Sequence, residues 1–189
     1  MIKRILPAEA LLLVSVMWVI FLIDLVVPGI SFDHFGIQPR QLGGLTGILV
    51  SPLLHGGLVH IIANTIPLLI LAALVRLSAG SSQMNLVMLA GVAGSGLGTW
   101  LFGLGDVVIG ASGLVFALIG YLLADAYFRP SLRSWGIAIL SFGLYGSALL
   151  SLFVFLPFVS WAAHFWGLVV GIVIASLLRS QKVIVRLSD

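Results

Sequence analysis

Three short groups of polar residues interrupt an otherwise strongly apolar sequence. Each group combines polar side chains with glycines, and together they supply one serine, three histidines and one asparagine. A serine hydroxyl becomes an effective nucleophile when an imidazole takes its proton, and fixed N–H donors stabilise the oxyanion that forms in acyl transfer. The sequence therefore holds the parts that nucleophilic acyl transfer requires. The groups are His55, His60 and Asn64; Gly110, Ser112 and Gly113; and His164, Gly167 and Gly171.

The types and spacing of these residues indicate a role for each. Ser112 is the candidate nucleophile, and His164 is the candidate general base because an imidazole has an unperturbed pKa of about 6.5. His60 and Asn64 are four residues apart, so they share one helix face and can both donate to an oxyanion, together with the Ser112 backbone N–H. We expect His55 to orient a loop or to hydrogen-bond in the cavity rather than to react.

The overall composition indicates an integral membrane protein. Apolar residues make up 61% of the 189 residues and charged residues only 8%, against roughly 25% charged in a typical soluble domain. The net charge of +3 fits attraction to anionic lipid rather than nucleic-acid binding. The absence of cysteine excludes disulfides and thiol catalysis, and without a His-Glu-x-x-His motif we expect neither a metal nor another cofactor.

Apolar stretches long enough to cross a bilayer predict a six-helix, all-α polytopic bundle in one domain, residues 1–189, since about 20 residues of helix span the hydrocarbon core. Residues 41–54 are also uncharged, but their glycines and proline disfavour a helix, so an irregular loop dipping into the membrane surface is expected. The predicted spans are 6–27, 57–75, 84–104, 107–128, 135–155 and 159–178.

The distribution of positive charge predicts the orientation. With a cytoplasmic N-terminus, eight of the nine Lys and Arg residues are cytoplasmic and only Arg40 is outside, as the positive-inside rule requires. Both termini are then cytoplasmic, and all three polar groups lie in the outer leaflet, where they can meet. Gly167 and Gly171 follow His164 on its own helix face, and such small residues allow another helix to approach closely.

Carboxylates are poorly placed for the chemistry. Asp24, Asp33 and Asp106 are expected at or beyond the membrane edge, so a Ser–His dyad is predicted. Residues 103–106 spell the Gly-x-Gly-Asp of aspartyl intramembrane proteases, but that chemistry needs two aspartates in one site. The other candidate, Asp125, lies near the opposite membrane face and four residues before Arg129, which favours a structural ion pair.

The combination of motifs resembles the rhomboid family of intramembrane serine proteases. It consists of Gly-x-Ser-Gly around Ser112, His-x4-His-x3-Asn ending at Asn64, and Ala-His-x2-Gly-x3-Gly around His164. The resemblance implies a six-helix bundle, a Ser112–His164 dyad, and an oxyanion site involving His60 and Asn64. Phe116 replaces the tyrosine that many rhomboids carry four residues after the serine, which keeps an aromatic face for the histidine but removes the hydroxyl.

We therefore expect an endopeptidase of a bacterial inner membrane that cuts transmembrane or membrane-anchored proteins near the outer leaflet. The alternative is a catalytically inactive rhomboid-like protein that binds transmembrane clients. Substrate entry is expected beside the fifth span, because Leu156-Pro157 would give it a flexible outer connection. The bulky side chains of Phe153 and Phe155 are predicted to plug that entrance.

Overall fold

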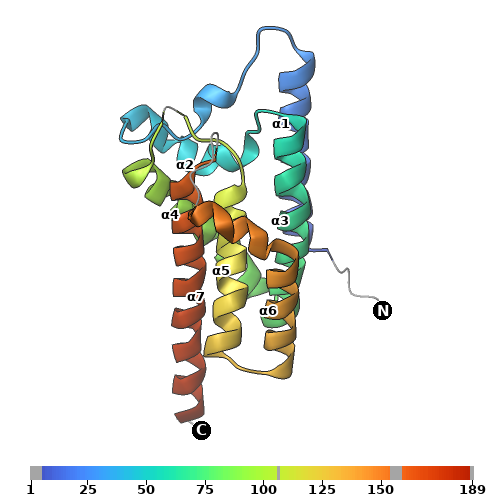
Figure 1. The fold of residues 1–189 in the computed structure, drawn as a ribbon, viewed down its shortest axis with the longest axis vertical. Helices are drawn as coiled ribbons and strands as arrows, with labels where there is room; N and C mark the ends of the chain where they lie inside the picture. The colour runs from blue at the N-terminus through green and yellow to red at the C-terminus, as the bar shows by residue number, and fades with distance from the viewer. Residues whose placement is uncertain (1–5, 106, 154–158, 188–189) are drawn as a thin grey trace.

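The computed structural model describes residues 6–105, 107–153 and 159–187, and within them all regular secondary structure is helical apart from one isolated β-bridge. Long helices run along one axis, and a lobe of short helices covers one end of the bundle (Figure 1). The short elements are η1 Asp33–Phe35, η2 Leu42–Leu45, α2 Gly47–Val50, η3 Ser51–Leu53 and η4 Gly146–Leu152. The long helices are α1 Ala8–Val26, α3 Leu58–Ala79, α4 Ser81–Phe102, α5 Ser112–Phe128, α6 Leu132–Tyr145 and α7 Trp161–Leu187.

Five helical segments are long and apolar enough to cross a membrane, so the prediction of an integral membrane protein is confirmed. Many large apolar side chains on them are exposed, which suits contact with lipid. The predicted irregular loop at residues 41–54 consists of short turns of helix and contains no spanning helix. The five segments are Ala8–Val26, Leu58–Ala79, Ser81–Phe102, Leu132–Leu152 and Trp161–Arg179.

Two predicted spans differ from the helices observed. The fourth, 107–128, becomes helical only at Ser112, because Gly110 has φ +110° and Val108 instead pairs with Ile37 in the isolated bridge. The fifth, 135–155, is α-helical only to Tyr145 and continues as the 3₁₀-helix η4. Asp106, Phe155 and the Leu156-Pro157 pair lie outside the described residues.

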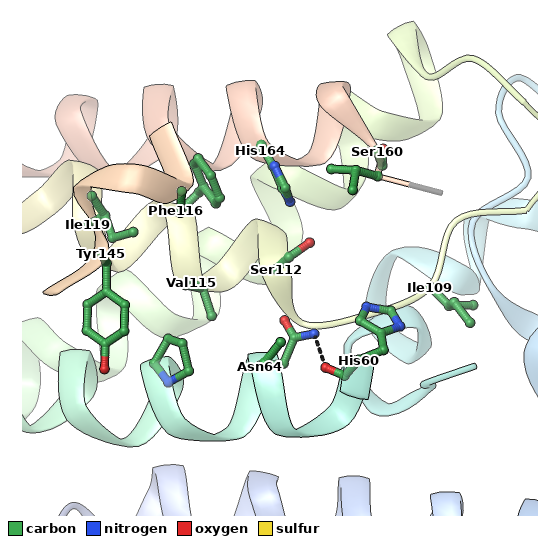
Figure 2. A pocket seen from close by; sticks show the side chains of 14 residues that line it. His60, Asn64, Ile109, Ser112, Val115, Phe116, Ile119, Tyr145, Ser160 and His164 are labelled. Atoms are coloured by element: carbon green, nitrogen blue, oxygen red, sulfur yellow. Dashed lines mark hydrogen bonds between the residues drawn. The ribbon is translucent and has the colours of Figure 1, made fainter. Parts of the chain in front are cut away.

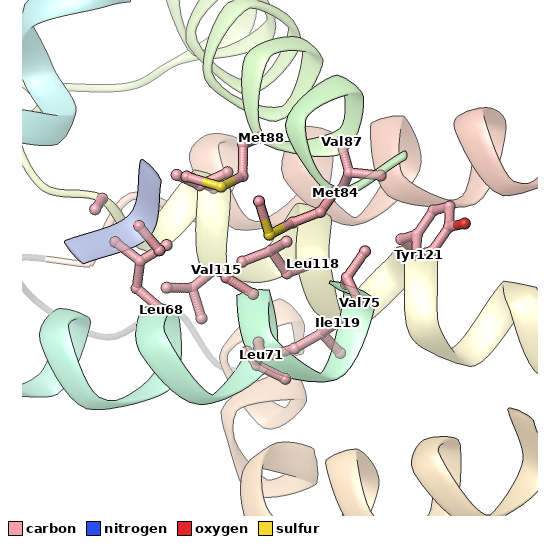
Figure 3. Close-up of a cluster of buried hydrophobic side chains, with 14 of the residues drawn as sticks. Leu68, Leu71, Val75, Met84, Val87, Met88, Val115, Leu118, Ile119 and Tyr121 are labelled. Carbon is pink, nitrogen blue, oxygen red and sulfur yellow. The ribbon is translucent and has the colours of Figure 1, made fainter. Parts of the chain in front are cut away.

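The core forms around α5, which packs against α3, α4, α6 and α7 (Figure 1). Thirteen of its 17 residues are buried, so this helix has almost no lipid-facing surface. Figure 3 shows side chains of α3 and α4 meeting those of α5 between the helices. The residues labelled there are Leu68, Leu71, Val75, Met84, Val87, Met88, Val115, Leu118, Ile119 and Tyr121.

Glycines bring α5 and α7 into backbone contact. A Cβ atom added to Gly167 would lie 2.1 Å from the carbonyl oxygen of Gly113, and one added to Gly171 would lie 2.1 Å from that of Ala117. On the other side of the contact, a Cβ at Gly120 would lie 2.4 Å from the Leu168 oxygen. No larger residue fits at these positions without separating the two helices. The register of α7 against α5 is therefore fixed by glycine.

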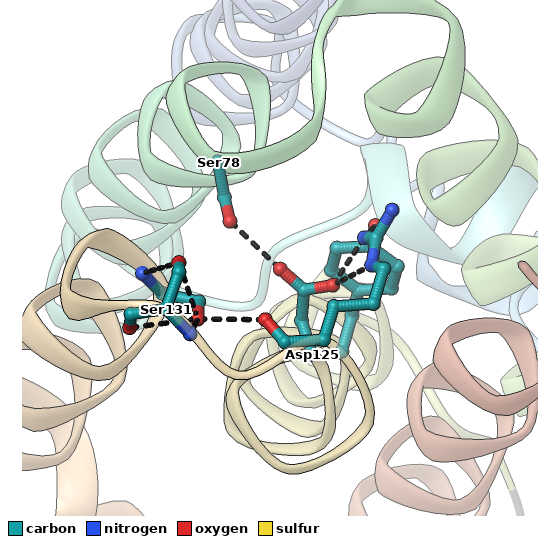
Figure 4. A network of polar contacts seen from close by, with 6 residues as sticks. Ser78, Asp125 and Ser131 are labelled. Carbon is teal, nitrogen blue, oxygen red and sulfur yellow. Dashed lines mark hydrogen bonds and ion pairs between the residues drawn. The ribbon is translucent and has the colours of Figure 1, made fainter. Parts of the chain in front are cut away.

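The last turn of α5 contains the predicted ion pair between Asp125 and Arg129, which is confirmed (Figure 4). Ser78 of α3 donates a 2.7 Å hydrogen bond to the Asp125 carboxylate. Arg129 also donates to the Tyr121 hydroxyl. The charge of Asp125 is thus neutralised and hydrogen-bonded, which a buried carboxylate requires.

Arg40 anchors the loop between α1 and α3 to the end of α4. Its guanidinium donates a 2.9 Å hydrogen bond to the Gly103 carbonyl, and its backbone N–H donates to the Trp100 carbonyl, also at 2.9 Å. The Trp100 indole in turn donates to the Gln41 carbonyl at 2.8 Å. The two bonds donated by Arg40 satisfy carbonyls at the C-terminus of α4, where a positive charge is also favourable.

Candidate active site

A cavity of about 250 Å³ lies between α3, α5, α7 and η4, at the end of the bundle covered by the short helices (Figures 1 and 2). Ser112, His164, His60 and Asn64 all line it, so the three polar groups of the sequence meet there. His60 and Asn64 come from α3, Ser112 from α5 and His164 from α7. The remaining lining residues are Ala63, Pro67, Ile109, Val115, Phe116, Ile119, Tyr145, Ala148, Val159 and Ser160.

Ser112 is the first residue of α5, and the backbone before it is shaped by glycine. Gly110 has φ +110°, which side-chain-bearing residues rarely adopt. A Cβ atom at Gly110 would also lie 2.6 Å from Nε2 of His60. One at Gly113 would lie 2.6 Å from Oγ of Ser95. The two glycines therefore let the start of α5 sit close against its neighbours, with the N–H groups of its first turn free to donate.

The His164 imidazole is held on two sides. Its ring stacks on Phe116, with centroids 4.1 Å apart and an interplanar angle of 9°, so the aromatic face is present without the tyrosine hydroxyl. Its Nδ1 is 2.8 Å from Oγ of Ser151, a residue of η4 that sequence reasoning missed. His164 is 7% exposed. The ring is therefore fixed in plane and largely shielded from water.

Ser112 and His164 point toward one another across the cavity (Figure 2). Within the described residues, no hydrogen bond joins the Ser112 hydroxyl to the imidazole. Hydrogen bonds between catalytic groups are often long in the absence of substrate and shorten when it binds. The geometry thus places the candidate nucleophile opposite the candidate base without a hydrogen bond between them.

Asn64 is buried at 3% exposure and donates a 2.9 Å hydrogen bond from Nδ2 to the His60 carbonyl (Figure 2). An amide nitrogen carries two N–H groups, so one remains for the cavity. His60 lines the same cavity, and its ring centroid is 4.9 Å from that of His55. Asn64 and His60 therefore remain the candidate donors, in the same cavity as Ser112.

His55 does not line the cavity that contains Ser112. It faces a second hollow shared with Asp24 and Asp33, on the side of α1. Burial raises the pKa of Asp33, and the Asp24 carboxylate adds to this, while His60 and His34 act in the opposite direction. The described residues contain no group of three or more His, Cys, Asp or Glu side chains arranged to hold a metal ion.

Of the two side chains predicted to plug the entrance, Phe155 lies outside the described residues, so the structure bears only on Phe153. Phe153 is 81% exposed and does not line the cavity. The part of this segment that does reach the cavity is Tyr145, at the end of α6, and Ala148 in η4. The change from α-helix to the tighter 3₁₀-helix after Tyr145 alters which side chains face inward.

A sequence profile of the rhomboid domain matches residues 42–181. The chain belongs to the rhomboid family. The matched range includes every residue that lines the cavity, whereas α1 precedes it. The resemblance found in the motifs is thus confirmed over most of the chain.

Several proteins are similar to large parts of this chain, and one of them is a rhomboid protease. An uncharacterized protein of Mycobacterium tuberculosis is 37% identical over 180 residues, covering 89% of this chain and 73% of the relative. One from Mycobacterium leprae is 35% identical over 162 residues, 80% of this chain and 63% of the relative. The rhomboid protease GlpG of Photorhabdus laumondii is 32% identical over 125 residues, 65% of this chain and 44% of that protein.

Proposed function

We propose that this rhomboid-family protein is an intramembrane serine endopeptidase that uses Ser112 as nucleophile and His164 as general base. One observation carries the proposal: Ser112 and His164 face each other in a cavity that also contains His60 and Asn64 (Figure 2). Polar residues inside a membrane protein are costly unless they have a use. The similarity to the rhomboid protease of Photorhabdus laumondii supports the same activity.

In the proposed reaction, the Ser112 hydroxyl attacks the carbonyl carbon of a substrate peptide bond as His164 takes its proton. The tetrahedral oxyanion accepts hydrogen bonds from the free Asn64 N–H, from His60 and from the backbone N–H of Ser112. His164 then gives the proton to the departing amine, which leaves an ester on Ser112. Water hydrolyses this ester, with His164 again acting as base.

The topology forms part of the proposal. We propose that α5 is the sixth membrane segment, enclosed by α3, α4, α6 and α7, and that both termini are cytoplasmic. The active site then lies near the outer leaflet of a bacterial inner membrane and receives transmembrane or membrane-anchored substrates. The concentration of Lys and Arg on one side supports this orientation.

A fluorophosphonate probe tests the nucleophile. We expect purified wild-type protein to be labelled on Ser112, located by mass spectrometry, and to cut a model transmembrane substrate. Ser112→Ala and His164→Ala should lose both, a rate loss of about 10⁴-fold or more. Ser160→Ala is the matched control, because Ser160 lines the same cavity. A folded Ser112→Ala protein that still cuts would disprove the assignment.

The second candidate is a catalytically inactive protein that binds transmembrane clients in the same cavity. The missing hydrogen bond between Ser112 and His164 favours it. Wild-type protein that captures a transmembrane peptide in detergent, yet resists the probe and cuts nothing, would replace the enzymatic proposal with this one.

A further inference from the structure

We infer that Ser151 is a positioning residue that sets the tautomer of His164. The inference rests on the proposed function, in which His164 is the base. Ser151 lies in η4, and its hydroxyl oxygen is 2.8 Å from Nδ1 of His164. It does not line the cavity, so it acts through the imidazole rather than on a substrate.

The hydrogen bonds around Ser151 determine which way its proton points. The hydroxyl lies 2.7 Å from the carbonyl oxygen of Ala148. A carbonyl oxygen can only accept, so the single proton of the hydroxyl is used there. Toward His164 the hydroxyl oxygen can then only accept. Nδ1 must therefore carry a proton for the 2.8 Å contact to be a hydrogen bond.

This assignment has a direct chemical consequence. A neutral imidazole carries one proton, so protonation of Nδ1 leaves a lone pair on Nε2. That lone pair is what a base needs in order to take the Ser112 proton. In a Ser-His-Asp triad a carboxylate fixes this same tautomer through Nδ1. Here a hydroxyl oriented by a backbone carbonyl does so without bringing a charge into the membrane.

A second hydrogen bond from the same 3₁₀-helix reinforces the arrangement. The Trp161 indole N–H, at the start of α7, donates to the Leu152 carbonyl at 2.8 Å. Consecutive residues of η4 thus bind residues of α7 that lie three apart, on one helix face. The Ser151 hydroxyl is therefore held in register with His164, whose ring is already fixed in plane by Phe116.

Ser151→Ala is the decisive variant, and Ser151→Thr keeps the hydroxyl. Ser147→Ala is the matched control, because Ser147 is an exposed serine of the same 3₁₀-helix. Two measurements are made on each protein. One is cleavage of a model transmembrane substrate. The other is ¹⁵N NMR of labelled histidine side chains, which number four, with His164 assigned from its absence in His164→Ala.

We expect Ser151→Ala to lower kcat about tenfold with KM unchanged, as removal of a partner behind a functional histidine does. The His164 tautomer should shift from Nδ1-protonated toward Nε2-protonated. Ser151→Thr should restore both, and Ser147→Ala should match wild type. A Ser151→Ala protein with wild-type kcat and an unchanged tautomer would overturn the inference. Wild-type protein that cuts nothing would instead overturn the proposed function, and its NMR spectrum would still decide the tautomer.

Discussion

The two ends of α5 hold polar residues in opposite conditions. At its C-terminal end, Asp125 is paired with Arg129 and bonded to Ser78, and Arg129 also reaches Tyr121. At its N-terminal end, Ser112 faces a cavity and no hydrogen bond ties its hydroxyl to His164. The first cluster has used its hydrogen-bonding capacity, whereas the second has kept capacity for another molecule.

This contrast separates structural from reactive polar groups in a membrane protein better than burial does. Asp125 and Asn64 are equally buried, each 3% exposed. Asp125 lies among its partners, while Asn64 keeps one N–H toward the cavity. Bonds within the fold offset the cost of burying Asp125, whereas in the proposed reaction the free N–H of Asn64 finds its partner only in the oxyanion of the transition state.

The strongest test of the contrast removes the side chain of Asn64, which keeps one N–H group toward the cavity. Asn64→Ala should lower kcat on the order of 10²–10³-fold while the protein folds and binds substrate, because an oxyanion donor acts mainly in the transition state. Steady-state kinetics in detergent or in liposomes measure this.

His55→Ala is the control for Asn64→Ala. His55 belongs to the same sequence motif but faces the second hollow with Asp24 and Asp33. Its loss should leave kcat close to wild type. Equal losses in the two variants would show that the motif as a whole supports the fold and that Asn64 is no oxyanion donor.

A weaker effect is expected at the entrance. Tyr145→Ala should raise cleavage of a transmembrane substrate several-fold and leave cleavage of a small soluble substrate unchanged, because Tyr145 lines the cavity where α6 becomes η4. Phe153→Ala, which removes an exposed ring, should change neither rate.

A cross-link sharpens the same test. The chain has no cysteine, so cysteines at Ala63 of α3 and Ala148 of η4 can be joined by a short bifunctional reagent. Both residues line the cavity. Joining them should slow cleavage of the transmembrane substrate. An unchanged rate would place substrate entry elsewhere.

The smallest effect on turnover is expected at the C-terminal end of α5, where the polar groups are already paired. Asp125→Asn should leave kcat unchanged, since Asp125 is 13 residues and about 20 Å of helix from Ser112. It should lower the free energy of unfolding by about 1–3 kcal/mol, because the Arg129 charge loses its partner. Thermal denaturation in detergent measures the loss. A large fall in kcat at wild-type stability would contradict the division between the two ends.

Much of this architecture follows from the sequence. Apolar runs located the helices, and the topology derived from charge placed His60, Asn64, Ser112 and His164 in one leaflet, where they could meet. The ion pair of Asp125 followed from its distance to Arg129. These features depend on local periodicity or on adjacent helices, which sequence patterns report.

The rest depends on backbone geometry and on contacts between segments far apart in the chain. The 3₁₀ turn after Tyr145 leaves no distinct hydrophobic pattern, so the fifth span was predicted as one continuous helix and Phe153 was placed at the entrance. Ser151 lies 13 residues before His164, and no helical period links them. Only the three-dimensional path of η4 across α7 brings the two together.

The length of α5 determines how deep the cavity lies. Its 17 residues give a helix of about 25 Å, shorter than a hydrocarbon core of about 30 Å. Because nearly all of α5 is enclosed by other helices, lipid does not have to adapt to the missing turn. In the proposed topology this shortfall becomes a well inside the protein that ends at Ser112, and the depth of the well does not depend on bilayer thickness. A thicker bilayer would thus leave the well unchanged. It would change only which part of a neighbouring lipid-embedded helix lies level with Ser112.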